Sequence, residues 1–186
     1  MTVLTMTERR GIATLLTGFL AVIAVAAAVV HLAAAAEVRD WLGFTFSGVP
    51  GTAEQALEIF INNARLLIAA IAACVVLQGS ALIDPEADRQ PPRWQSTAVH
   101  ICDVVLGTLA VANLAVIGAA IGAYGDRVVK HLLPHGPVEA LAFAIALALY
   151  VRSRRGPVAR RDFLRLAGLA LAVLIVAALL ETFVTP

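Results

Sequence analysis

Long apolar segments alternate with short polar connections along the whole chain. Four of them exceed the roughly 20 residues that a helix needs to cross a 30 Å hydrocarbon core. Inside hydrocarbon only helices and closed barrels satisfy the backbone, and these segments lack the alternation of barrel strands. The pattern predicts an all-α fold, a polytopic membrane helical bundle with five transmembrane helices in a single integral membrane domain, residues 1–186. The expected spans are about Gly11–Ala36, Leu57–Leu82, Thr97–Tyr124, Pro137–Val151 and Phe163–Val184.

The fourth segment, Pro137–Val151, is short for a span, and the residues before it explain how it can still cross. The sequence DRVVKHLL is followed by PHGP and then by continuous apolar chain. Proline suits the first turn of a helix, and glycine permits a tight bend. We therefore expect a short broken or re-entrant element before helix 4, with PHGP as a turn at or slightly below the membrane interface.

Composition supports the membrane assignment and narrows the function. The chain is 60% hydrophobic and only 15% charged, which is more apolar surface than a soluble domain of 186 residues can bury. A net charge of +1 gives no broad attraction for nucleic acid, so no nucleic acid partner is expected. Cys74 and Cys102 lie in apolar segments and read as small packing residues. No zinc spacing and no phosphate-binding loop occurs, so no cofactor and no metal is expected.

Basic residues are distributed unevenly between the two ends of the predicted bundle. The first segment is too long for the apolar part of a signal peptide, so it is expected to remain as helix 1. The three basic residues on the side away from the N-terminus are Arg39, Arg127 and Lys130. The ten on the side of the N-terminus are Arg9, Arg10, Arg89, Arg93, Arg152, Arg154, Arg155, Arg160, Arg161 and Arg165. This asymmetry predicts a multi-pass protein of the cell membrane with the N-terminus in and the C-terminus out.

Polar side chains from three predicted helices reach the same depth. Helix 2 carries three of them near its outer start, helix 4 opens with PHGPVE, and helix 5 carries a glutamate one turn before its outer end. An ionisable residue inside a span costs at least a few kcal/mol and is a functional candidate. Because arginine keeps its charge, Arg65 is expected to pair with Glu139 or Glu181. The resulting outer-leaflet polar cluster contains Asn62, Asn63, Arg65, His135, Gly136, Glu139 and Glu181.

Two interpretations of this cluster stay open at the level of sequence. Polar contacts between helices can simply hold a membrane bundle together, and a buried ion pair can specify packing without chemistry. The same groups can also form an ion or proton path, or a site for an extracytoplasmic partner.

Two further features concern helix 3. His100 and Asp103 lie three residues apart and form a secondary inner polar pair, expected at the cytoplasmic interface and in reach of Arg93 or Arg152. Gly118 and Gly122 form a G-x-x-x-G pattern, which allows another helix to approach closely.

Three stretches of the chain carry a resemblance to a known family. FINNARLL begins the second span, LLPHGPVEALAF begins the fourth, and ALLETFVTP ends the chain. Their order and spacing over about Phe60–Pro186 resemble the stage II sporulation protein M family of bacterial and archaeal integral membrane proteins. The PHG-x-x-E element is the most specific part. The resemblance maps the family's asparagine, histidine, glycine and two glutamates onto Asn62 or Asn63, His135, Gly136, Glu139 and Glu181.

The resemblance implies a non-enzymatic scaffold or subunit of a membrane complex in the cell envelope, because founding members recruit peptidoglycan-degrading partners during engulfment. Expected partners are other membrane or cell-envelope proteins, the lipid bilayer, and a second copy in a homo-oligomer. The alternative is a transporter subunit, either a permease partnered with an ATPase or a proton-coupled carrier, since ionisable groups are buried. An enzyme is not expected, because His135 and Glu139 have no nucleophile or metal set beside them.

Overall fold

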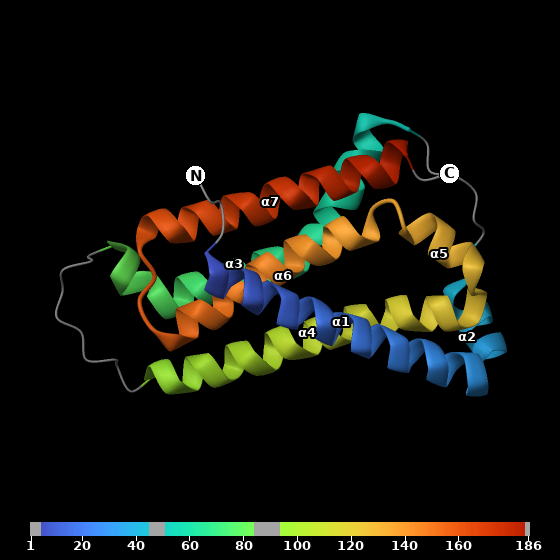
Figure 1. Cartoon of the computed structure of the whole chain (residues 1–186), viewed down its shortest axis with the longest axis horizontal. Helices are drawn as coiled ribbons and strands as arrows, with labels where there is room; N and C mark the ends of the chain where they lie inside the picture. Colours follow the sequence, from blue (N-terminus) through green and yellow to red (C-terminus); the bar gives the residue numbers. More distant parts are fainter. Residues whose placement is uncertain (1–4, 45–50, 84–93, 185–186) are drawn as a thin grey trace.

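The computed structural model describes residues 5–44, 51–83 and 94–184, and the regular secondary structure of these ranges is α-helix joined by short turns (Figure 1). The helices are α1 (Met6–Ala33), α2 (Ala35–Leu42), α3 (Ala53–Ile83), α4 (Trp94–Tyr124), α5 (Asp126–Leu132), α6 (Gly136–Arg155) and α7 (Arg160–Phe183).

Five of these helices, α1, α3, α4, α6 and α7, are long and apolar enough to cross a membrane. The prediction of an all-α bundle with five such helices is therefore confirmed. The spans differ from prediction mainly at their ends. Helix α1 begins at Met6 rather than Gly11, because Thr5 and Glu8 form a capping box in which each side chain bonds the other residue's backbone N–H.

The core of the bundle is formed by α3, α6 and α7, which pack against one another, while α1 and α4 lie together along one side (Figure 1). The largest fully buried side chains come from the three core helices and are Leu67, Ile145, Leu149, Leu174 and Cys74. Alanines fill much of the remaining contact, since small residues let helices approach closely when no difference in hydrophobicity drives them together.

Helices α1 and α4 meet at the predicted glycine pattern. A Cβ atom added at Gly118 would lie 2.6 Å from the carbonyl oxygen of Ile23, and one at Gly122 would collide with the carbonyl oxygen of Ala27. Any larger residue at these two positions would push the helices apart, which explains why glycine is needed there.

A short helix and a turn precede α6, as predicted, but the turn ends at His135, so Gly136 and Pro137 already belong to α6. Helix α5 ends at Leu132, the turn occupies Leu133–His135, and α6 begins at Gly136 with Pro137 in its first turn. Helix α6 is 20 residues long, about 30 Å, so the fourth span reaches full length by extending past Val151 into the arginine-rich segment.

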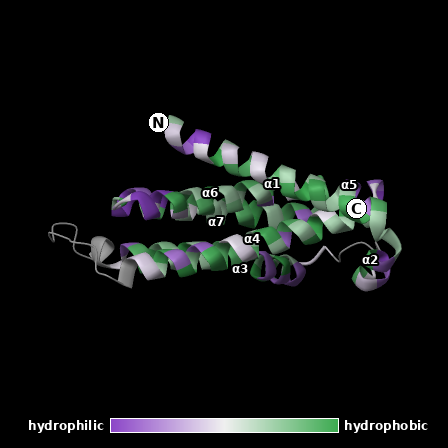
Figure 2. Ribbon diagram, turned by 90° about the horizontal axis from the view of Figure 1, so that it is seen from below, coloured by the Kyte–Doolittle hydropathy of each residue, from purple (hydrophilic) through white to green (hydrophobic). Residues whose placement is uncertain are grey.

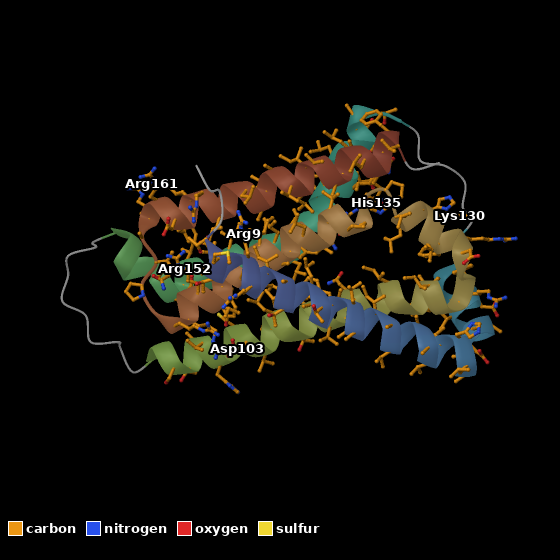
Figure 3. All side chains as sticks on the ribbon, in the orientation of Figure 1. Arg9, Asp103, Lys130, His135, Arg152 and Arg161 are labelled. Carbon is orange, nitrogen blue, oxygen red and sulfur yellow. The ribbon has the colours of Figure 1, made fainter. Side chains whose placement is uncertain are left out.

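Polar residues gather at the two ends of the bundle, and the middle is apolar (Figure 2). Figure 3 places Arg9, Arg152 and Arg161 at one end, with His135 and Lys130 at the other. Helix α1 begins at the first of these ends and α7 finishes at the second, as an odd number of spans requires (Figure 1). The assignment of the arginine-rich end to the cytoplasm stays a prediction, and Arg89 and Arg93 lie outside the described residues.

Helix α2 lies at the end that carries His135, and the sequence did not predict it. The Arg39 Nε donates a 2.7 Å hydrogen bond to the carbonyl of Ala123. The Tyr124 hydroxyl donates a 2.9 Å bond to the carbonyl of Arg39. Gly43, in the left-handed conformation at φ +59°, ends the helix. These bonds attach α2 to the end of α4, so α2 is stabilised by tertiary contacts.

Candidate functional site

Four polar side chains from three helices form a compact group at the end of the core that is predicted to face outward, and we call this group the outer cluster. His135 precedes α6, Glu139 lies in its first turn, Glu181 lies in the last turn of α7, and Asn63 comes from α3. His135 is buried with 7% of its surface exposed, and both glutamates are half-buried. The predicted meeting of three helices at this depth is therefore present, with His135 at the position labelled in Figure 3.

The members of the outer cluster are close enough to share a ligand. The Nε2 atom of His135 lies 3.8 Å from Oε2 of Glu181. One nitrogen of His135 and one oxygen each of Glu139 and Glu181 all lie within 4.8 Å of one another. The side chain of Asn63 lies close enough to the Glu181 carboxylate to interact with it electrostatically. Two carboxylates and an imidazole thus converge on one small volume.

The local backbone fixes His135 and Glu139 relative to each other. The carbonyl of His135 accepts hydrogen bonds from the N–H groups of Val138 and Glu139, each 3.0 Å long. A Cβ at Gly136 would lie 2.8 Å from Cγ of Leu132, so a larger residue there would force the Leu132 side chain to move. This rigid turn accounts for the spacing within PHG-x-x-E.

The outer cluster holds more negative than positive charge. No lysine or arginine among the described residues forms an ion pair with Glu139 or Glu181. Burial lowers the pKa of His135, which precedes the membrane-spanning α6, so its imidazole is neutral near pH 7. Two neighbouring carboxylates without a cation repel each other, and this favours binding of a proton or a metal ion between them.

The predicted pairing of Arg65 with Glu139 or Glu181 is wrong. Arg65 is exposed, and its Nη2 donates a 3.2 Å hydrogen bond to Oδ1 of Asn62 on the same helix. Residues advance by about 100° around a helix, so Arg65 lies about 200° from Asn63 and faces away from the core. Of the two asparagines, Asn63 belongs to the outer cluster and Asn62 accompanies Arg65.

The inner polar pair is also altered. Asp103 contacts the neighbouring helix α6, where its carboxylate accepts a 2.6 Å hydrogen bond from the Tyr150 hydroxyl and forms a 2.9 Å ion pair with Arg154. The predicted partners were Arg93, which lies outside the described residues, and Arg152, which binds elsewhere. His100 is exposed and is not drawn into this contact.

A larger polar group at the same end was missed by the sequence analysis. Glu8 of α1 is 9% exposed and forms ion pairs with Arg152 at 2.9 Å and Arg165 at 3.0 Å. Asp162 pairs with the same two arginines, at 2.9 Å and 3.7 Å. These contacts, with those of Asp103, make up the inner network. The Thr5–Glu8 capping signal in the sequence could have pointed to Glu8 as part of a helix.

Gln78 joins α3 to the short connection between α6 and α7. Its Nε2 donates 2.8 Å hydrogen bonds to the carbonyls of Ser153 and Gly156, and its Oε1 accepts a 3.0 Å bond from the N–H of Val158. Gln78 is 3% exposed, so it satisfies three backbone groups that water does not reach easily.

Comparison with known proteins identifies the family. The model of the family described as Stage II sporulation protein M matches residues 12–186. The chain therefore belongs to this family, which confirms the resemblance carried by the three quoted stretches. No curated protein and no solved structure matches the chain.

Proposed function

We propose that this protein is a non-enzymatic, multi-pass scaffold subunit of a cell-membrane complex that acts on the cell envelope. One observation carries the proposal: α3 presents a polar face to its surroundings in the outer part of the bundle. Glu58, Asn62 and Arg65 are all exposed, and their spacing of four and three residues places them on one side of the helix. We call these three residues the α3 polar face.

The α3 polar face is costly if only lipid tails surround it. Asn63 of the same helix reaches the outer cluster, at the level of Glu181, so Arg65 lies near that depth on the opposite side of α3. A charged arginine inside a span costs a few kcal/mol, although its long side chain can reach toward the interface. A protein neighbour that supplies acceptors to Arg65 removes this cost, which supports a complex formed through this face.

The apolar middle of the bundle supports a scaffold over the transporter alternative. Between the inner network and the outer cluster, the core positions are occupied by packed side chains such as Leu67, Ile145 and Leu174, each at most 2% exposed. A conduit for ions or protons needs polar groups or water along its length. An apolar groove between α1 and α4 contains no ionisable side chain in its lining.

Crosslinking in native membranes tests the proposal. A photoreactive residue at Asn62 should capture a discrete envelope protein, whereas one at Ile175, an exposed apolar residue of α7, should not. Arg65→Ala should weaken co-purification of that protein about tenfold, since a buried charged contact contributes roughly 1.5 kcal/mol or more at an interface.

A matched control distinguishes an effect of the α3 polar face from a general effect of substitutions in α3. Ile68→Ala changes an exposed residue on the same helix, one turn further from the outer end, and should leave co-purification unchanged. Equal capture from Asn62 and Ile175, or equal loss from both alanine variants, would contradict the proposal. If only a second copy of this chain is captured, the α3 polar face is a homo-oligomer interface and the scaffold proposal is wrong.

A further inference from the structure

We propose that His135, Glu139 and Glu181 bind a divalent transition-metal ion of the zinc type at the outer end of the core. The proposal is independent of the α3 polar face, which lies on the other side of α3. The sequence predicted no metal, because it contains no zinc spacing. The three ligands escape that criterion because they come from two helices that are far apart in the chain.

The first argument is geometric. Zinc bonds to histidine nitrogen at about 2.0–2.1 Å and to carboxylate oxygen at about 2.0–2.2 Å, so its ligand atoms lie roughly 3–3.5 Å apart. Here the candidate atoms lie within 4.8 Å of one another, and the His135 to Glu181 distance is 3.8 Å. Rotation of the glutamate side chains is enough to close the difference, because glutamate has three rotatable bonds.

The second argument is electrostatic. Glu139 and Glu181 lie close together, and the described residues contain no lysine or arginine paired with either. Glu181 also lies in the last turn of α7, where the helix dipole disfavours a negative charge. A divalent cation bound between the two carboxylates offsets both effects.

The third argument concerns the type of metal. A site with one imidazole and two carboxylates suits zinc, manganese or iron better than magnesium or calcium, which prefer oxygen ligands alone. Two surrounding features resemble the supports that hold metal ligands in place. Asn63 lies close to the Glu181 carboxylate, and the backbone of the turn holds His135 against Glu139.

The site is placed to be reached from outside the bundle. The Glu181 side chain is 26% exposed, whereas that of His135 is 9% exposed. Three protein ligands leave a fourth position of a tetrahedral zinc for water or for a group from a partner. The bound ion would tie the end of α7 to the start of α6.

Metal titration of the full-length protein tests the inference. The chain is purified in detergent with an affinity tag that contains no histidine, treated with chelator and titrated with ZnCl₂ by calorimetry. We expect one zinc ion per chain, retained in the presence of a large excess of MgCl₂. Glu139→Gln and Glu181→Gln should each weaken zinc binding by at least about tenfold, and Asn63→Ala by about tenfold.

Two control variants change the same residue types away from the site. Glu37→Gln alters an exposed glutamate of α2, and His31→Asn alters an exposed histidine of α1, so both should bind zinc as the wild-type protein does. Cobalt provides a second measurement, since a tetrahedral site gives visible absorption bands. We expect these bands in the wild-type protein and their loss in His135→Asn.

One zinc ion lost in the three ligand variants and kept in both controls supports the site. No stoichiometric binding, equal binding by the wild-type protein and Glu181→Gln, or displacement of zinc by magnesium would overturn it. A variant that does not fold, as judged by size-exclusion chromatography, is replaced by its conservative partner, Glu139→Asp or Glu181→Asp, which should retain weakened binding.

Discussion

The inner network and the outer cluster are built from the same kinds of side chain but differ in charge balance. The inner network pairs the acids Glu8, Asp103 and Asp162 with the bases Arg152, Arg154 and Arg165. The outer cluster has two carboxylates and a neutral imidazole, with no ion-paired base among the described residues. A balanced group is satisfied within the chain. In the outer cluster no arginine or lysine of the described residues balances the two carboxylates, and a bound cation would do so.

We therefore expect substitutions in the inner network to lower the stability of the fold, and substitutions in the outer cluster to affect binding. Removing a polar group from the inner network should destabilise the protein, because its partners lose their contacts. Neutralising an acid in the outer cluster should have the opposite effect when no metal is present. Thermal unfolding is measurable in detergent with a thiol-reactive dye in a Cys102→Ala background, since Cys102 is partly exposed. Cys74 is 0% exposed and reacts only when the core opens.

The largest effect is expected for Gln78→Met, which keeps the length of the side chain and removes its polar end. Two buried carbonyls and one N–H would lose their partner, at about 1 kcal/mol or more each, so the loss of stability should be about 3 kcal/mol. For a chain of this size the unfolding temperature should fall by about 6–12 °C. A fall of less than 2 °C would show that the connection between α6 and α7 does not depend on Gln78.

Glu8→Ala should have the next largest effect. It removes one of the two acids that Arg152 and Arg165 share, while Asp162 remains, and these arginine side chains are 40% and 34% exposed and can be partly rehydrated. We therefore expect about 2 kcal/mol, below the roughly 3–5 kcal/mol typical of a fully buried pair. Glu58→Ala, at an exposed position, is the control and should change the unfolding temperature by less than about 1 °C. If Glu8→Ala and Glu58→Ala shift the unfolding temperature equally, the ion pairs of Glu8 do not stabilise the protein.

The fold was largely predictable because hydrophobic length determines which segments cross the membrane. The spans, the turn before α6 and a close helix approach at Gly118 and Gly122 follow from apolar runs, prolines and glycines. The glycines did not indicate that α1 is the helix that approaches. Helix α2 was not predictable in this way, since EVRDWL has no apolar run and owes its helix to contacts of Arg39 with the end of α4.

The sequence predicted the level of the polar residues along the bundle, but it did not predict which side of each helix faces its neighbours. Hydropathy places Asn63, Glu139 and Glu181 at one level, yet it does not say which side of α3 faces α7. A rotation of about 200° between Asn63 and Arg65 decides which of them meets the carboxylates. Glu8 was missed because it precedes the first apolar segment and was taken as part of a polar end.

A smaller effect of opposite sign is expected for Glu139→Gln in chelator. Removing one of two neighbouring carboxylates relieves their repulsion, or the work of protonating one of them, so stability should rise by about 1 kcal/mol. The unfolding temperature should rise by about 2–4 °C. Adding ZnCl₂ should stabilise the wild-type protein and not the variant. Destabilisation of the variant in chelator would mean that Glu139 is already satisfied within the chain, as the acids of the inner network are.

The smallest effect on the isolated protein is expected for Arg65→Ala, although this residue was first predicted to hold three helices together. Arg65 is exposed and donates only to Asn62, one turn earlier on α3, so its removal should cost less than about 0.5 kcal/mol in detergent. Combining it with Glu181→Gln tests the former pairing directly. If the two residues do not interact, their effects on stability should add within about 0.3–0.5 kcal/mol. If Glu181→Gln partly rescues Arg65→Ala, the two residues do form an ion pair, and Arg65 belongs to the outer cluster. Additivity in detergent, together with loss of a co-purifying protein from native membranes, would instead locate the role of Arg65 outside the chain, which is where the α3 polar face points.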